Sequence, residues 1–256
     1  MYALPANISP LSDNRTDPAL VIRPAFPFAR ASGFHWLQLM PQLIVTREAA
    51  ELGLVATYHV VEDLRNRQRD PDFDEFKDAL CARLSSLYSQ EFVARDKIVQ
   101  GFRDLHWSVG CSPKKFPCSI EGLIKFLRRH GTLPNINLAV DCYNAVSLET
   151  RLTLGAHDLD QVEGNIILQL AQGNEHFVPL GRDQHELVQA GEYCYVDESG
   201  EILCRLDYKQ CDKSKIKLTT TRCLIIVQGH ASTASDLLDY GRDKLVALVN
   251  RFCRAI

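Results

Sequence analysis

This chain of 256 residues has the length of one large domain or two small ones, and its 46% of hydrophobic residues is enough for a buried core, which excludes disorder throughout the chain. The formal net charge of -3 argues against a broad basic surface that holds nucleic acid mainly by releasing counterions. Residues 1–15 lack the apolar run of a signal peptide, and no later stretch approaches the roughly 18 apolar residues of a membrane span. We therefore expect a cytoplasmic protein that does not enter a membrane.

The first half of the chain contains a weakly patterned start and two helical segments. Residues 1–35 are rich in Pro, Asn and Asp, and we interpret them as an extension that packs on a single domain formed by residues 36–256. Residues 34–45 and 52–61 read as strands. Apolar residues recur at helical spacing in residues 70–88 and again in residues 96–106, which predicts two helices.

The second half is predicted to be mostly strand between two further helices. Ser119 can cap a helix that ends at Gly131, and Thr233 with Asp236 forms a capping-box pattern for the last helix. Strands are predicted at residues 138–140, 165–171, 176–180, 192–197, 201–206 and 223–229. Because short, hairpin-like connections join these strands, the sequence predicts an α+β fold with a mixed, largely antiparallel sheet flanked by helices.

The cysteines and glycine-rich loops give no sign of a metal or cofactor. Nine cysteines form an odd, scattered set without a C-x-x-C motif, which indicates reduced, buried thiols. The chain has no G-x-x-x-x-G-K-S/T or G-x-G-x-x-G loop. We therefore expect no metal and no cofactor.

A dense group of polar residues lies between residues 140 and 164, next to the strand predicted at residues 138–140. Buried polar side chains are costly unless they bind something, so this segment is the candidate site. The group consists of Asp141, Asn144, Ser147, His157, Asp158 and Asp160.

The same segment carries a family resemblance. It contains, in order, Val140-Asp141, Asn144, Leu148-Glu149, His157-Asp158 and Glu163-Gly164, between the flanking runs SPKKFPCSIEGLIKFLRRHGTLPNIN and TTTRCLIIVQG. This order resembles the B3/B4 domain, the tRNA-binding and editing region of the phenylalanyl-tRNA synthetase β chain, which also occurs as a freestanding protein. The resemblance covers about residues 112–250.

The resemblance implies a function and a set of residues. It implies a freestanding trans-editing hydrolase, with aminoacylated tRNA as its partner, that deacylates mischarged tRNA; nothing resembles the ATP site of a complete synthetase. His157 and Asn144 would be catalytic. The implied substrate-binding residues are Asp141, Ser147, Asp158, Gly164, Thr221 and Gln228. Where the synthetase has a glutamate that reads the hydroxyl of mischarged tyrosine, this chain has Val227 and Gln228, so we expect a different noncognate amino acid.

Basic residues within the region of resemblance are candidates for RNA contact, although each cluster alone is also typical of a solvated surface. The candidates are Lys114, Lys115, Arg128, Arg129, Lys213, Lys215 and Lys217.

Several alternatives stay open from the residues alone. His157 can simply bond a loop backbone, and Asn144 can be a helix cap or turn former. The His157-Asp158 pair also occurs in metal-dependent phosphohydrolases, which need further histidines. Cys142 is a possible nucleophile, although its strand-like context favours packing. As a whole, the chain can also be a non-catalytic module that binds tRNA or an amino acid.

Overall fold

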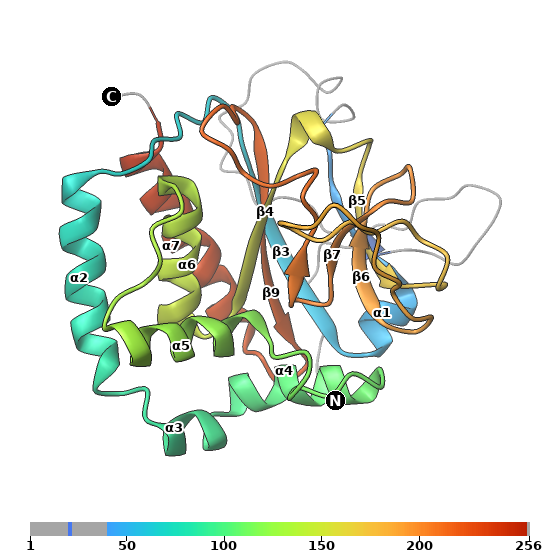
Figure 1. Cartoon of the computed structure of the whole chain (residues 1–256), viewed down its shortest axis with the longest axis horizontal. Helices are drawn as coiled ribbons and strands as arrows, with labels where there is room; N and C mark the ends of the chain where they lie inside the picture. Colours follow the sequence, from blue (N-terminus) through green and yellow to red (C-terminus); the bar gives the residue numbers. More distant parts are fainter. Residues whose placement is uncertain (1–19, 22–39, 255–256) are drawn as a thin grey trace.

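The computed structural model describes residues 20–21 and 40–254, and the described strands form two sheets (Figure 1). One sheet has the order β1-β2-β5-β6-β7-β8, with β1 (Leu20–Val21), β2 (Leu43–Val45), β5 (Ile166–Leu170), β6 (Tyr193–Val196), β7 (Ile202–Arg205) and β8 (Lys209–Gln210). The other has the order β3-β9-β4, with β3 (Leu54–Val61), β9 (Cys223–His230) and β4 (Thr153–Asp158). Only the β2–β5 pair is parallel among these pairings, so the predicted α+β class with a largely antiparallel sheet is confirmed.

A layer of helices covers one face of the three-stranded sheet (Figure 1). Helices α6 (Leu138–Thr150) and α7 (Ser235–Phe252) pack on each other and against this sheet. The remaining helices are α1 (Arg47–Glu51), α2 (Pro71–Ser85), α3 (Gln90–Arg95), α4 (Lys97–Ser108) and α5 (Ser119–His130), with a short 3-10 helix at Leu159–Gln161. None of the helices in the described ranges is long and apolar enough to cross a membrane.

Helix α4 sits against the end of β9 because Gly101 leaves room there. A Cβ atom at Gly101 would lie only 2.1 Å from the His230 ring. That ring is also held by α4, since its Nε2 lies 2.9 Å from the carbonyl oxygen of Ile98. The close contact therefore fixes α4 to the sheet.

The prediction of a strand at residues 138–140 is wrong, because these residues begin helix α6. Asn137 caps the helix, and its side-chain oxygen accepts a hydrogen bond from Val140 N at 3.1 Å. Eleven of the thirteen residues of α6 are buried, so the helix has no polar face that would reveal its period.

Other boundaries differ in smaller ways. Cys118, not Ser119, is the N-cap of α5, and Ala234, not Thr233, is the N-cap of α7; neither makes a side-chain cap. Residues 176–180 form only two isolated bridges, from His176 and Pro179. The predicted end at Gly131 is confirmed, with a φ of 72°. Most of the predicted 1–35 extension, and the start of the 34–45 run, lie outside the described residues.

Candidate functional site

The two sheets face each other across a group of polar side chains. In the β4–β9 register, Thr153 lies opposite Gln228 and His157 opposite Leu224, so Thr153, position 155 and His157 share one face with Gln228. Tyr195 on β6 of the other sheet donates a hydrogen bond from its hydroxyl to Gln228 Oε1. This face of the three-stranded sheet therefore looks toward the six-stranded sheet. We call the group Thr153, Gly155, His157, Gln228 and Tyr195 the inter-sheet site.

The inter-sheet site has open space at its edge. Strand β4 is an edge strand of its sheet, and Gly155 lies near its centre between Thr153 and His157. A Cβ atom at Gly155 would meet no other atom within 4 Å. A ligand can therefore approach the backbone of β4 between the Thr153 and His157 side chains.

Two buried polar atoms of the site have no hydrogen-bond partner. Thr153 is 4% exposed and Gln228 2% exposed, and neither Thr153 Oγ1 nor Gln228 Nε2 is hydrogen-bonded within the described part of the chain. The other such atoms in residues 40–254 belong to Arg103, Glu149 and Arg151, which all form ion pairs. Since an unsatisfied buried polar atom costs about 1–3 kcal/mol, the two neutral atoms mark a place that can receive a polar ligand.

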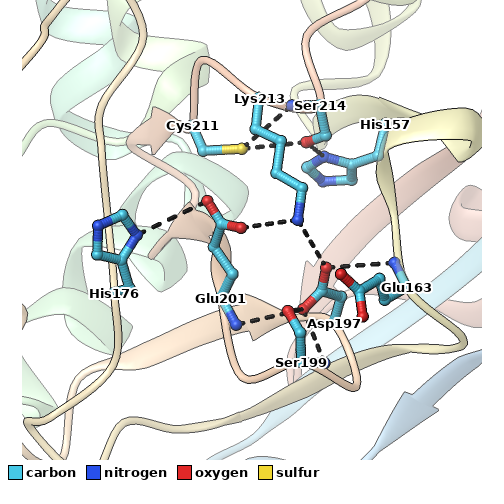
Figure 2. Close-up of polar contacts among 9 residues, drawn as sticks. All are labelled: His157, Glu163, His176, Asp197, Ser199, Glu201, Cys211, Lys213 and Ser214. Carbon is cyan, nitrogen blue, oxygen red and sulfur yellow. Dashed lines mark hydrogen bonds and ion pairs between the residues drawn. The ribbon is translucent and has the colours of Figure 1, made fainter.

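His157 is held by its Nδ1 atom (Figure 2). Nδ1 lies 2.8 Å from Ser214 Oγ and 3.4 Å from the side-chain amide nitrogen of Gln210. Both groups can donate to Nδ1, which favours the neutral tautomer with the proton on Nε2. Nε2 has no hydrogen-bond partner among residues 40–254.

Burial determines the charge of this histidine. His157 is 2% exposed, and burial lowers its pKa to about 4. Its imidazole is therefore neutral at neutral pH. It can donate a hydrogen bond from Nε2, but it is a weak base.

The loop that carries Ser214 is braced by an ionic network (Figure 2). Lys213 Nζ lies 2.7 Å from Glu201 Oε2 and 3.4 Å from Asp197 Oδ2. Asp197 also accepts hydrogen bonds from Ser199 and from the backbone nitrogen of Glu163 at 3.3 Å. The network ties the Ser214 loop to the β6–β7 hairpin and so fixes the partner of His157.

Three predicted site residues lie on α6, in the helical layer on the opposite face of the sheet from the inter-sheet site. Asp141 Oδ1 accepts a hydrogen bond from Ile136 N at 2.9 Å, and burial raises its pKa to about 6. The Ser147 hydroxyl donates to the carbonyl oxygen of Leu152 and closes the α6–β4 turn. Asn144 is half-buried and hydrogen-bonds no described residue, His157 included.

The other three predicted residues, Asp158, Gly164 and Thr221, lie at the end of β4 or in loops. Asp158 accepts hydrogen bonds from Thr220 Oγ1 at 2.6 Å and from Asp160 N at 3.1 Å. Gly164 has a φ of 68°, and Thr221 is exposed. Of the predicted substrate-binding residues, all of which are described, the structure places Gln228 on the same face as His157.

The predicted RNA-binding cations fall into two groups. Lys213 is paired as described above, and Lys215 lies 2.8 Å from Asp212 Oδ1. The others are exposed and form no ion pair with an acidic residue of the described ranges. They are Lys114, Lys115, Arg128, Arg129 and Lys217.

Sequence reasoning missed Thr153 and the contact between Tyr195 and Gln228. The signal for Thr153 was the alternation in TLGAHD, where Thr153, Gly155 and His157 share one side of a strand. Tyr195 had no local signal, because its contact with Gln228 joins different sheets. Cys142 is fully buried, and hydrogen bonding to Cys253 together with burial raises its pKa, so it is not a thiolate.

The rest of the described chain contains weaker candidates for a functional site. No group of three or more His, Cys, Asp or Glu side chains in the described ranges is placed to hold a metal ion. A cleft of about 780 Å³ lies beside the loop before α5 and strand β8. Four of its charged side chains are already paired, Arg205 with Glu192 at 2.7 Å and Lys209 with Glu186 at 3.0 Å, and Lys115 also lines it. The inter-sheet site is the stronger candidate, because two of its buried polar atoms lack a hydrogen-bond partner in the described residues.

Comparison with known proteins points to one family. The family model for the B3/4 domain matches residues 102–253. The phenylalanine–tRNA ligase beta subunit of Mycoplasma genitalium is 30% identical over 105 residues, which are 41% of this chain and 12% of that protein. A crystal structure of an N-terminal fragment of the phenylalanyl-tRNA synthetase beta-subunit from Pyrococcus horikoshii matches 82% of this chain and 48% of that chain, with 13% identity and a TM-score of 0.45. The chain thus corresponds to a small part of the curated relative.

Proposed function

Since the chain belongs to the B3/4 domain family, we propose that it is a freestanding hydrolase that removes a wrong amino acid from tRNA. The proposed reaction cleaves the ester between the amino acid and the terminal ribose. The proposed partner is the aminoacylated end of a tRNA.

One observation carries this proposal: a neutral histidine with a free Nε2 stands beside open space and two unpaired polar atoms. His157 borders the space at Gly155, and Thr153 and Gln228 supply the unpaired atoms. Preorganised polar groups around a small space are what ester hydrolysis requires, because the ester is already reactive.

In the proposed mechanism, His157 stabilises charge and orients the ester. A water molecule attacks the carbonyl carbon, and Nε2–H of His157 donates a hydrogen bond to the carbonyl oxygen as it becomes negative. The carbon–oxygen bond to the ribose then breaks, the ribose oxygen takes the proton that the attacking water gives up, and the free amino acid leaves. Because the pKa of His157 is about 4, we assign it this donor role and not that of a general base.

Asn144 has no role in this mechanism, because it lies on α6, across the three-stranded sheet from His157. The exposed cations of α5 and of the loop before it would contact the RNA backbone.

The test is deacylation of a panel of mischarged tRNAs. We expect the wild-type protein to release at least one amino acid faster than buffer does. His157→Ala should slow this release by about 100-fold, as loss of an oxyanion donor does elsewhere. Thr57→Val, on the opposite face of the sheet, is the matched control, and Asn144→Ala should likewise leave release unchanged, because Asn144 lies on that same side. Absence of turnover across the whole panel would refute the hydrolase.

A non-catalytic binding module is the second candidate, and the deep burial of His157 favours it. The His157→Ala variant distinguishes the two functions. If His157→Ala loses hydrolysis but keeps tRNA affinity, the protein is an enzyme. If the wild type binds tRNA without hydrolysis and His157→Ala binds equally well, the protein is a binding module.

A further inference from the structure

The amide of Gln228 is fixed in one orientation. The Tyr195 hydroxyl donates to Gln228 Oε1 and has no other acceptor within the described residues, so the oxygen is occupied and the nitrogen is left free. Burial keeps Tyr195 protonated by raising its pKa well above the usual range. Gln228 therefore offers its N–H donors to a ligand, while Tyr195 takes one of the two acceptor positions of Oε1.

Thr153 offers a second polar contact beside these donors. It lies directly opposite Gln228 in the register, where Cβ atoms are about 4.5–5.5 Å apart. Its hydroxyl is unpaired and can donate or accept. One small polar group can therefore bond both side chains.

The inter-sheet site contains no charged group. Its members are Thr153, Gly155, Gln228, Tyr195 and His157, whose imidazole is neutral as shown above. No charged residue of the described ranges hydrogen-bonds any of these side chains. A carboxylate or ammonium at the end of the amino acid's side chain, placed between Thr153 and Gln228, would lose its hydration without gaining a counterion.

We propose that the inter-sheet site reads the side chain of the amino acid and selects a neutral one that ends in a hydroxyl or carboxamide. The oxygen of that group accepts a hydrogen bond from Gln228 Nε2, and Thr153 Oγ1 bonds the same group. This inference rests on the proposed function, because it assumes that the ligand is an aminoacyl group.

The test uses stable analogues in which an amide joins the amino acid to the 3′ position of 3′-amino-3′-deoxyadenosine. Calorimetry compares the threonine analogue with the valine analogue, which has the same shape without the hydroxyl. It also compares the asparagine analogue with those of leucine and aspartate. We expect at least one of the threonine and asparagine analogues to bind about 10- to 100-fold more tightly than its counterparts.

Variants of the inter-sheet site test which side chains produce this binding preference. Thr153→Val, and separately the pair Gln228→Met with Tyr195→Phe, should reduce that preference to less than about threefold. Thr57→Val is the matched control, because Thr57 lies on the opposite face of the same sheet, opposite Val227. Circular dichroism of each variant checks that it is folded.

The outcomes separate this inference from the proposed function. Equal binding of polar and apolar analogues, or unchanged preference in both site variants, would overturn the inference alone if mischarged tRNA is still hydrolysed. Failure of every analogue to bind, together with no hydrolysis, would overturn both.

Discussion

At the scale of single residues, the hydroxyls around β4 differ in whether they are satisfied. Thr150 donates to the carbonyl oxygen of Val146 at 2.8 Å, and Thr220 donates to Asp158 at 2.6 Å. Thr153 is as deeply buried as they are but has no hydrogen-bond partner among the described residues. An unpaired hydroxyl in a buried position lowers stability, so it is best explained by a ligand contact.

This difference predicts opposite effects of the same substitution on stability. Thr153→Val replaces an unpaired hydroxyl by a methyl group of the same shape, and we expect the free energy of unfolding to rise by about 1 kcal/mol. Thr220→Val leaves Oδ2 of the buried Asp158 carboxylate without its donor, and we expect a loss of about 2 kcal/mol. Urea unfolding of both variants measures these changes. A loss of stability in Thr153→Val similar to that in Thr220→Val would show that the Thr153 hydroxyl is satisfied.

At the scale of elements, the sequence predicts amphipathic helices better than buried ones. Helix α2 follows its signals closely, with Asp70 at the N-cap and Pro71 at its first position. Helix α6 was predicted to begin as a strand, because nearly all its residues are buried and only tertiary packing sets its conformation.

The candidate site follows the same rule. His157 stands out in the sequence within the polar segment 140–164, and Gln228 is a candidate because of the family resemblance. Their place on one face depends on the β4–β9 register, and the Tyr195 contact depends on the packing of two sheets. Such non-local geometry has no signature in neighbouring residues, so Thr153 and the Tyr195–Gln228 contact are found only in the structure.

Helix α5 leads to a prediction about RNA affinity. Arg128 and Arg129 lie exposed in its last turn, without an acidic partner in residues 40–254. If they contact phosphates, Arg128→Ala with Arg129→Ala should weaken tRNA binding about 10-fold and reduce the salt dependence of log K by about one to two units of slope. Lys215→Ala is the matched control, because Lys215 is already paired with Asp212. Titrations at several salt concentrations measure both quantities, and an unchanged slope in the double variant would exclude α5 as the contact.

At the scale of the whole molecule, two buried histidines connect separate parts of the fold and titrate in opposite directions. His106 on α4 has an acceptor at each ring nitrogen, Phe116 O at 2.7 Å from Nδ1 and Asp207 Oδ1 at Nε2. Burial alone would lower its pKa, but the hydrogen bond and charge of Asp207, with the Phe116 carbonyl, raise it overall. His157 has no such acceptor, and burial lowers its pKa to about 4.

These opposite shifts predict how stability depends on pH. The stabilisation that His106 adds to the folded state is complete below about pH 6.5, the pKa of histidine in the unfolded chain. It is lost as pH rises through the higher pKa of the folded chain. The stabilisation linked to neutral His157 is complete above about pH 6.5. It is lost as pH falls toward 4, because the unfolded chain then binds a proton that the folded chain does not. That second loss amounts to about 3 kcal/mol.

Urea unfolding between pH 4.5 and 9 tests both signs by comparing variants with the wild type, so that other titrating groups cancel. We expect His157→Gln to flatten the acid side of the stability profile, since glutamine stays neutral and can still bond Ser214. We expect His106→Gln to lower stability most below pH 6.5 and to lessen the decline on the alkaline side, because it removes the charged partner of Asp207. An acid side that keeps its full slope in His157→Gln would mean that the imidazole is hydrated and protonates normally, and would contradict the dry, neutral histidine on which the proposed donor role depends.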